Sequence, residues 1–295
     1  MLPNFIVIGA AKAGTTALYW YLADHPAVFM SPVKETNYFA YGRDAQGRLL
    51  YGDPSHHRFP ITSRGEYEHL FAEAGAAAAV GEASPIYLEC PQAAGRIRAA
   101  LPEARLICVL RHPVDRAYSD YQMYLRSRGE RLDPVRDLTA QAEWARADSH
   151  WMRIGRYHGQ LARYFELFPR GQIRVLLLDD FRPSPLGAMQ GLYGFLGVDP
   201  AFVPDFDTPH NVGGMPANRW LEGIFSSGAI RSALAPWIPK RAANWVRRVR
   251  TRNMRQVPPL PVALREELTG HFQDDIARTS TLIGRDLDHW LAPRG

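Results

Sequence analysis

The sequence has only two cysteines, Cys90 and Cys108, and no apolar run long enough to cross a membrane. A chain of 295 residues with so few cysteines is not a small disulfide-stapled scaffold, and a bilayer crossing needs about 20 apolar residues in succession. The first apolar stretch, residues 5–8, is too short for a secretory signal and lacks its charged leader. Cys108 lies inside the apolar run 106–110, which predicts a buried thiol. We therefore expect a cytoplasmic protein.

Low-complexity tracts and internal repeats are also missing. Hydrophobic residues make up 46% and charged residues 22%, which excludes a disordered chain or a collagen. The length fits one large α/β domain or two small ones. We expect a single domain over residues 1–295, with a core at 4–211 and a helical extension or lid at 212–295.

The net charge of +5 is concentrated in one segment. Residues 231–256 contain eight Lys or Arg and no Asp or Glu, which leaves 27 basic and 30 acidic residues in the rest of the chain. Trp237, Ile238 and Trp245 are interspersed with these arginines. The segment is therefore expected to contact an anionic ligand, an anionic glycan or a membrane surface, unless it is simply a solvated helix face. Its pattern is not typical of nucleic-acid recognition, so we expect no nucleic-acid partner.

Strand-like and helix-like segments alternate over the first two thirds of the chain. Short apolar runs predict strands at 4–9, 77–81, 105–110 and 173–178, and helical patterns occupy 15–25, 113–125, 157–168 and 184–196. This alternation predicts an α/β fold with a P-loop-like parallel sheet of four to five strands flanked by helices. Beyond residue 210 we expect no strands, only a helical, basic C-terminal extension. Ligands of such sheets bind at the carboxyl ends of the strands.

The segment GAAKAGTT at residues 9–16 joins the first predicted strand to the first predicted helix. Gly9 and Gly14 permit a tight turn with inward-pointing N–H groups, and the helix that follows favours an anion at its N-terminus. Thr15 and Thr16 add hydroxyl donors. The pattern indicates an anion-binding loop of the P-loop type, and the alternative is a plain strand-to-helix turn.

The loop departs from the nucleoside triphosphate signature G-x-x-x-x-G-K-S/T, in which lysine directly follows the second glycine. Here Thr15 has that place, and Lys12 lies two residues before Gly14. A magnesium-dependent kinase also needs a carboxylate near its metal ion. Asp179, after the strand-like run 175–178, keeps this alternative open.

Several segments together resemble the sulfotransferase superfamily, which uses 3′-phosphoadenosine 5′-phosphosulfate (PAPS). FIVIGAAKAGTTALYWYL resembles its 5′-phosphosulfate loop, and RLICVLRHPVDRAYSDY resembles its 3′-phosphate element, in which Arg111 ends a strand and Ser119 lies eight residues on. KETNYF at residues 34–39 resembles the K-E-x-H/N-Y/F-F motif of the bacterial and heparan-sulfate-like branch, which includes N-deacetylase/N-sulfotransferases and 3-O-sulfotransferases.

The resemblance implies that PAPS is the co-substrate, that 3′-phosphoadenosine 5′-phosphate (PAP) is the product and that no metal is required. Lys12 would stabilise the leaving group, and Arg111 would offer a bidentate guanidinium to the 3′-phosphate. The donor-binding residues carried over from the family motifs are Lys12, Ala13, Gly14, Thr15, Thr16, Arg111 and Ser119. A surface ion pair for Arg111 and a helix-surface hydroxyl for Ser119 are the alternatives.

The resemblance also makes Glu35 the candidate general base, since it matches the acidic position of the family motif. We expect its burial beside Tyr38 and Phe39; the alternative is a solvated pair with Lys34. Glu82 is either a second carboxylate near the acceptor or a strand-end residue bonded to backbone.

Histidines are the base in small-molecule sulfotransferases, but His56 and His57 lie in no matching motif. His112 is expected to be a helix cap or a supporting residue.

The acceptor is not specified by the sequence. Glycosaminoglycan members often have E-K-S-P-x-Y, whereas residues 82–87 here are EASPIY and lack the lysine. We expect transfer to a hydroxyl group, less readily to an amine, of a carbohydrate, a glycolipid or a small metabolite. The alternatives are the kinase and a non-catalytic module that binds a nucleotide or an anionic glycan.

Overall fold

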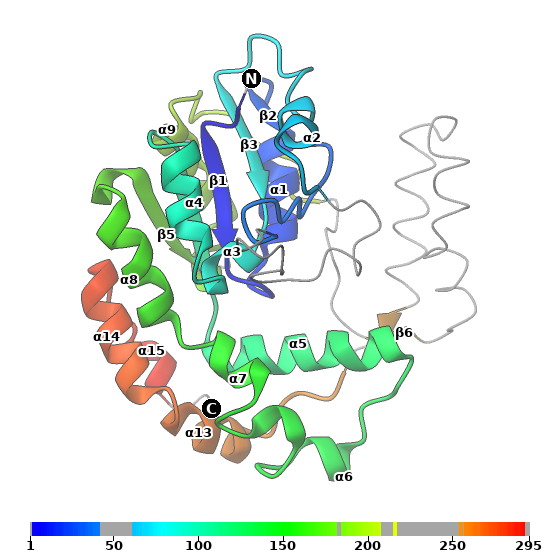
Figure 1. Cartoon of the computed structure of the whole chain (residues 1–295). Coiled ribbons are helices and arrows are strands. Elements are labelled where there is room, and N and C mark those ends of the chain that lie inside the picture. The colour runs from blue at the N-terminus through cyan, green and yellow to red at the C-terminus, as the bar shows by residue number, and fades with distance from the viewer. Residues whose placement is uncertain are drawn as a thin grey trace, which may run out of the picture.

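The computed structural model describes residues 2–41, 61–181, 184–207, 215–216, 254–255 and 257–292. Five parallel strands form the main sheet in the order β2-β3-β1-β4-β5. Their bounds are β1 (Phe5–Gly9), β2 (Val28–Met30), β3 (Ala79–Ala83), β4 (Arg105–Leu110) and β5 (Ile173–Leu177). The predicted parallel α/β fold is confirmed (Figure 1).

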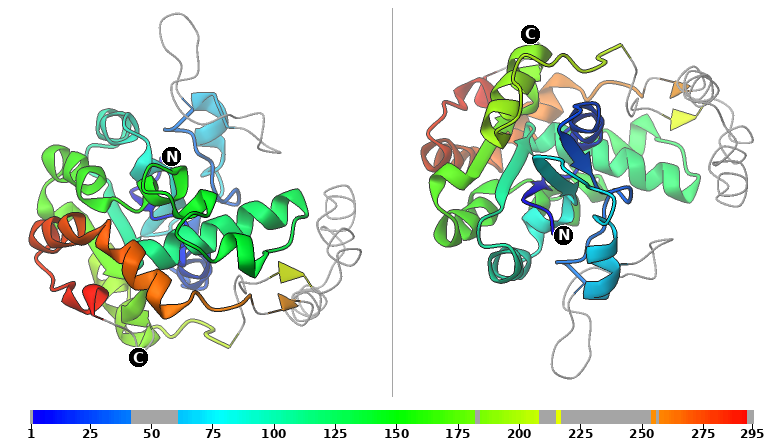
Figure 2. Two further views of the ribbon diagram at one scale, coloured as in Figure 1. Left: turned by 90° about the horizontal axis from the view of Figure 1, so that it is seen from below. Right: turned by 90° about the horizontal axis from the view of Figure 1, so that it is seen from above.

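Helices cover both faces of the sheet (Figure 2). α1 (Thr15–Ala23) and α9 (Pro185–Leu196) lie on one face, where the Tyr193 hydroxyl donates to the Tyr21 carbonyl oxygen at 2.7 Å. α3 (Ile86–Glu89), α4 (Ala93–Ala100) and α8 (Tyr157–Leu167) lie on the other, where the Tyr164 hydroxyl donates to the Tyr87 carbonyl oxygen at 2.6 Å. The central strands are therefore buried on both sides, which explains their continuous apolar runs.

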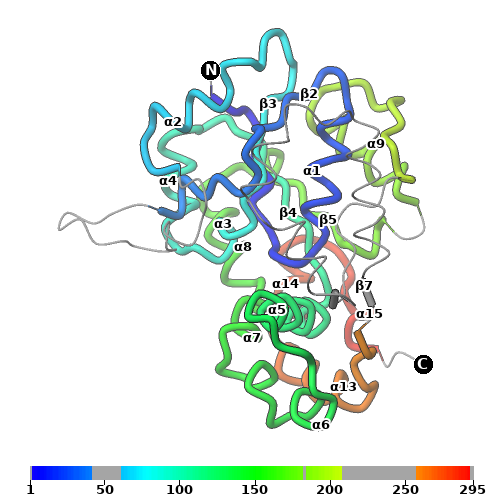
Figure 3. The backbone as a smooth tube through the Cα atoms, turned by 90° about the vertical axis from the view of Figure 1, so that its right-hand side faces the viewer, coloured from blue at the N-terminus to red at the C-terminus, as the bar shows by residue number. Residues whose placement is uncertain are grey.

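A third group of helices lies below the carboxyl ends of the strands, where α5 (Pro113–Arg128) runs beside α7 (His150–Ile154) and α13 (Val262–Gly270) (Figure 3). α14 (Gln273–Ile283) packs against α8. The remaining short elements are α2 (Arg64–His69), α6 (Pro134–Asp137), α15 (Asp288–Leu291) and the 3-10 turns η2 (Glu143–Ala145), η3 (Arg170–Gln172) and η4 (Leu178–Phe181).

Polar contacts fasten the C-terminal helices to this group. Arg265 of α13 bonds Asp115 of α5 at 2.9 Å, and both side chains are largely buried. Trp290 of α15 is fully buried, and its carbonyl oxygen lies 2.9 Å from Nε2 of His112. The helical character predicted for the C-terminal part is confirmed over 262–291, and the single-domain division at residue 211 stays a prediction.

The element predictions fail in two places. β2 was not predicted, because three residues are too few for a periodic signal. The expectation of no strands beyond residue 210 is wrong, since β6 (Met215–Pro216) pairs antiparallel with β7 (Met254–Arg255), and two-residue strands are likewise too short to detect. The rest of the basic segment 231–256, together with His56 and His57, lies outside the described residues.

Both cysteines are free and buried, as predicted for Cys108, and burial raises the pKa of each thiol. Across the described ranges, no helix combines the length and apolar character that a bilayer crossing demands.

Gly81 in β3 allows the close approach of Phe5 from β1, and this contact yields a stability prediction. A Cβ atom at Gly81 would lie 2.3 to 2.5 Å from three atoms of the Phe5 ring. Gly81→Ala should therefore lower the free energy of unfolding by roughly 1–3 kcal/mol through overpacking, measured by urea denaturation.

Gly95 in α4 supplies the matched control, because nothing lies within 4 Å of its added Cβ. Gly95→Ala should be neutral or stabilise the protein by up to about 1 kcal/mol. Equal effects at the two positions would contradict this account of the sheet.

Candidate functional site

The loop between β1 and α1 has the geometry of an anion-binding turn. Gly14 is the N-cap of α1 with φ +90°, and a Cβ there would also lie 3.0 Å from Leu178. Glycine avoids both problems. Leu18 makes the first intrahelical bond, to the Gly14 carbonyl oxygen at 3.1 Å, so the N–H groups from Gly14 to residue 17 have no acceptor within the helix, whereas the Ala13 N–H donates to the Ala10 carbonyl oxygen at 3.2 Å. The positive end of the helix dipole adds to this preference for an anion.

Thr15 and Thr16 open α1 with two hydroxyl groups. Thr15 is buried and Thr16 is half-buried. Neither hydroxyl hydrogen-bonds to any residue in the described part of the chain. A partly buried hydroxyl is normally paired, so these two donors suit a ligand at the helix start.

Lys12 lies in the same loop in a left-handed conformation, with φ 66°. Its Nζ lies 3.2 Å from Sδ of Met123, a weak acceptor, and this is its one hydrogen bond to a described residue. Burial lowers the pKa of Lys12, while Asp120 and, less strongly, Glu35 raise it. A half-buried ammonium with so poor a partner is placed to meet an anion.

Arg111, at the carboxyl end of β4, joins the two halves of the predicted donor site. Its Nη1 donates to the Lys12 carbonyl oxygen at 3.2 Å, and its own carbonyl oxygen accepts from the Tyr157 hydroxyl at 2.8 Å. Ser119 lies on α5, half-buried, and its hydroxyl bonds no residue in the ranges described. The structure therefore brings Arg111 to the loop as the sequence predicts.

The face of α5 near Lys12 contributes residues that sequence reasoning missed. Asp120 raises the pKa of Lys12, whereas Arg126 and Arg111 lower it, and Met123 contacts Nζ directly. Steps of four and three along α5 lead from Ser119 to Met123 and then to Arg126, so helical spacing was the signal that could have found them.

Glu35 lies in the loop 31–41 after β2 and is not buried, so the expected burial beside Tyr38 and Phe39 is wrong. Its side chain is 45% exposed and pairs with Lys34. Tyr38 stacks instead on Tyr67 of α2, with ring centroids 4.4 Å apart. The alternative of a solvated Lys34–Glu35 pair describes this structure, although Glu35 is close enough to Lys12 to raise its pKa.

Glu82 is the fully buried centre of a hydroxyl cluster. Its Oε2 accepts from Thr36 and Ser84, both at 2.7 Å, and its Oε1 accepts from Tyr67 at 2.8 Å and Tyr87 at 2.9 Å. It is therefore neither an exposed acceptor-site carboxylate nor a residue bonded to backbone. Burial raises the pKa of Glu82, and the four hydroxyl donors oppose this shift.

The Glu82 cluster fixes the backbone that carries Glu35. Glu35 and Asn37 flank Thr36 with φ of 63° and 53°, a conformation uncommon for residues other than glycine. The Glu35 N–H donates to the Ala83 carbonyl oxygen at 2.9 Å, and the Asn37 N–H donates to Ser84 Oγ at 3.1 Å. Such a strained segment persists only where its surroundings determine it, and the bond from Thr36 to Glu82 supplies that constraint.

Two other candidates have structural partners. His112 occupies the N-cap position of α5, but its side chain makes no cap and Nε2 faces the Trp290 carbonyl oxygen instead. Asp179, the candidate magnesium carboxylate of the kinase alternative, accepts from Trp290 Nε1 at 3.1 Å. Within the described ranges, no group of three or more His, Cys, Asp or Glu side chains is arranged as a metal site.

Residues 3–202 match the family model described as the sulfotransferase family. This match covers well over half of the sequence, so the chain belongs to the sulfotransferase family. The predicted family resemblance is confirmed, and the chain is a sulfotransferase. The kinase and binding-module alternatives lose their support.

Several curated relatives are bifunctional heparan sulfate enzymes. The human bifunctional heparan sulfate N-deacetylase/N-sulfotransferase 2 is 29% identical over an alignment of 218 positions that covers 68% of this chain and 22% of that protein. The Drosophila melanogaster bifunctional heparan sulfate N-deacetylase/N-sulfotransferase is 29% identical over an alignment of 214 positions that covers 68% of this chain and 20% of that one. The chain thus spans about a fifth of the length of these relatives.

Solved structures agree with this assignment. The sulfotransferase from Alicyclobacillus acidocaldarius superposes with a TM-score of 0.70 at 31% identity, covering 99% of this chain and 100% of that one. A sulfotransferase domain from the curacin biosynthetic pathway has a TM-score of 0.50 at 13% identity over 97% of this chain and 99% of its own, which shows the fold alone.

The Glu82 cluster yields a prediction with a pH signature. Glu82→Gln leaves two hydroxyls facing an amide that does not accept from them, so the free energy of unfolding should fall by roughly 1–3 kcal/mol near pH 4. Because burial raises the pKa of Glu82, wild type loses stability as pH rises from the ordinary value of 4.5 through the raised value. The difference between wild type and Glu82→Gln should therefore shrink as pH rises.

Urea unfolding of both proteins from pH 4 to pH 8 measures this difference. Glu103→Gln, at an exposed carboxylate before the amino end of β4, is the control and should show no such trend. A pH-independent difference at Glu82 would show that its ionisation is not linked to folding.

Proposed function

We propose that this sulfotransferase moves a sulfuryl group from PAPS to a hydroxyl group of a carbohydrate, a glycolipid or a small metabolite. In this proposal Lys12 stabilises the leaving group and Glu35 is the general base. The observation that supports it best is the bond from Arg111 to the Lys12 carbonyl oxygen. This bond places a loop that suits one anionic group beside a guanidinium that suits a second. PAPS carries two such groups, its 5′-phosphosulfate and a 3′-phosphate that ATP lacks.

The side chains present fit such a donor. The hydroxyls of Thr15, Thr16 and Ser119 bond no described residue, and Lys12 has only a thioether as partner. Thr15 and Thr16, with the backbone of Ala13 and Gly14, would hold the 5′-phosphate, and Arg111 with Ser119 would hold the 3′-phosphate. When bound, PAPS supplies an activated sulfuryl group.

Lys12 and Glu35 then have complementary tasks. The Lys12 ammonium would stabilise the negative charge left on the phosphate oxygen when its bond to sulfur breaks. Glu35 would accept the proton of the acceptor hydroxyl as the new bond from oxygen to sulfur forms. The reaction exchanges one sulfur–oxygen bond for another, so it needs no redox partner. A transferring sulfuryl group carries less charge than a phosphoryl group, which is why positioning and Lys12 are expected to suffice without a metal.

The Glu35 carboxylate pairs with Lys34. The half-exposed position of Glu35 leaves it open to an acceptor arriving from solvent. The left-handed backbone at Glu35, fixed through Thr36 and Glu82, sets the direction of this side chain.

The acceptor class rests on the relatives. Their names record action on heparan sulfate and N-sulfation, which favours a carbohydrate and keeps a sugar amine as the second candidate. Ala83 stands in the lysine position of the glycosaminoglycan motif and is fully buried. This position therefore offers no counterpart of the lysine that assists the rate in glycosaminoglycan members. We keep a hydroxyl as the first candidate acceptor.

Calorimetric titration of the full chain with PAP, ADP and magnesium-ATP tests donor recognition. Tight PAP binding with far weaker ADP binding is expected, because Arg111 and Ser119 read the 3′-phosphate. Equal binding of PAP and ADP, or no binding, would refute the proposed donor. With PAPS bound, a screen of hydroxyl-bearing glycans beside N-deacetylated ones then separates hydroxyl from amine transfer.

The two cationic residues should have separable effects. Lys12→Ala should lower kcat by roughly 10²- to 10³-fold with a smaller change in donor affinity, as for loss of one charge-stabilising donor. Arg111→Ala should mainly weaken PAP binding, by roughly 10- to 100-fold. Initial rates and PAP titrations measure both, with Arg98→Ala on α4 as the control. If Lys12→Ala mainly weakened PAP binding and Arg111→Ala mainly lowered kcat, the two proposed roles would have to be exchanged.

Glu35→Gln should keep PAP affinity and lower kcat by roughly 10²- to 10⁴-fold, the usual contribution of general base catalysis. The isosteric amide does not accept the proton. Rates with a fixed acceptor give the measurement, and Glu103→Gln is the matched control. A Glu35→Gln enzyme with full kcat would show that another group takes the proton.

A further inference from the structure

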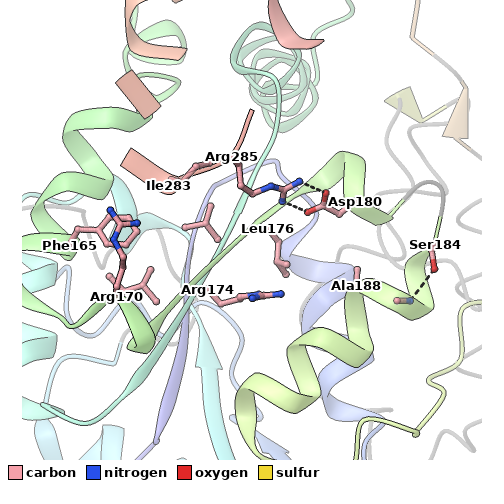
Figure 4. Close-up of a pocket in the computed structure, with 12 residues that line it drawn as sticks. Phe165, Arg170, Arg174, Leu176, Asp180, Ser184, Ala188, Ile283 and Arg285 are labelled. Atoms are coloured by element: carbon pink, nitrogen blue, oxygen red, sulfur yellow. Dashed lines mark hydrogen bonds and ion pairs between the residues drawn. The ribbon is translucent and has the colours of Figure 1, made fainter. Parts of the chain in front are cut away.

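A cavity of about 570 Å³ lies at β5, the edge strand of the main sheet in the described part of the chain. Its lining includes the four consecutive residues 173–176, whose side chains alternate between the two faces of the sheet. The cavity therefore wraps around the strand edge, between α8 and α14 on one side and α9 on the other (Figure 4).

Three guanidinium groups and one carboxylate line this cavity. Arg170 comes from η3, Arg174 from β5 and Arg285 from the turn after α14, and Asp180 comes from η4. Arg285 donates to both oxygens of Asp180, at 2.7 and 2.8 Å, so this pair is neutral. An excess of two positive charges remains on Arg170 and Arg174.

The two excess cations are held in different ways. Arg170 lies over the Phe165 ring, 4.9 Å from its centroid, and donates to the Leu282 carbonyl oxygen at 2.8 Å, which fixes its position. Arg174 extends toward α9, where its Nη2 would lie 3.4 Å from a Cβ added at Gly191. Arg174 makes no hydrogen bond or ion pair with any described residue, so its five donors are available.

The remaining walls are apolar and include Phe165, Ile173, Leu176 and Ile283. A cavity of this size is typical of sites for small organic ligands. Guanidinium donors beside apolar walls match a molecule with a tetrahedral oxyanion at one end and an apolar ring at the other. We propose that this cavity binds an organic sulfate or phosphate ester through Arg174, with Arg170 adding positive charge to the same cavity, at a site separate from the donor loop.

Binding at the cavity must be distinguished from binding at the donor loop, because η4 contacts both. Asp180 of η4 lines the cavity, and Leu178 of η4 lies against Gly14 of the donor loop. The probes are 2-naphthyl sulfate, 2-naphthyl phosphate and the neutral 2-naphthol, titrated calorimetrically into the full chain. Arg174→Gln removes the available charge at an exposed position, where folding should be unaffected. Arg278→Gln removes an exposed charge from α14 outside the cavity, and Arg111→Ala weakens binding at the proposed donor site.

The expected result is saturable binding of at least one naphthyl ester that Arg174→Gln weakens by roughly tenfold or more, the usual effect of losing a charged hydrogen bond. Arg278→Gln and Arg111→Ala should change this affinity less than twofold. The stronger of the sulfate and phosphate esters identifies the natural class. Equal binding of 2-naphthol, loss of binding in Arg111→Ala, or an unchanged affinity in Arg174→Gln would each overturn the proposal. None of these results depends on PAPS being the donor.

Discussion

The buried carboxylate of Glu82 is the constraint on which the segment around Glu35, the proposed acceptor side of the site, depends. Burying this group costs free energy that only hydrogen bonds can offset, and all four of its bonds in the described part of the chain come from hydroxyl groups. Those donors belong to the loop after β2, to α2 and to the segment after β3. A single strand-end residue therefore joins three stretches that are distant in sequence. The left-handed backbone at Glu35 and Asn37 is held because Thr36, between them, is one of those donors.

The proposed donor side depends on backbone groups, whereas the segment around Glu35 depends on side-chain hydrogen bonds. Here the backbone, through Gly14 and the start of α1, creates the preference for an anion, and few side-chain bonds complete the loop. Arg111 connects this loop to the next strand by holding the Lys12 carbonyl oxygen, so the position of Lys12 depends on β4 as well as β1. The hydrogen-bonded loop around Glu35 and the incompletely bonded loop around Lys12, the proposed acceptor and donor sides, thus meet at the carboxyl edge of one sheet.

Much of this arrangement could be predicted from the sequence, because its signals are local. The apolar runs that became β1, β4 and β5 and the glycine-containing loop each lie within about ten residues. The burial of Glu82 could not be predicted, since Tyr67 and Thr36 reach it from 15 and 46 residues away. The exposure of Glu35 was not predicted, for the same reason. Tyr38, which was expected to bury it, stacks instead on Tyr67 of α2. The contact between Met123 and Lys12 spans 111 residues and depends on where α5 lies below the carboxyl ends of the strands (Figure 1).

Two carboxylates elsewhere in the molecule have closer partners of opposite charge than Lys12 has. Asp115 with Arg265 and Asp180 with Arg285 are bidentate or nearly so, and in each case the bonds lower the pKa of the carboxyl group. These two carboxylates are therefore neutralised by close cationic partners, unlike Glu82, whose partners are hydroxyls. Lys12 has only a thioether and more distant carboxylates, and the hydroxyls beside it bond no described residue. In our proposal the anionic donor completes this cluster, as the arginines complete the sites of Asp115 and Asp180.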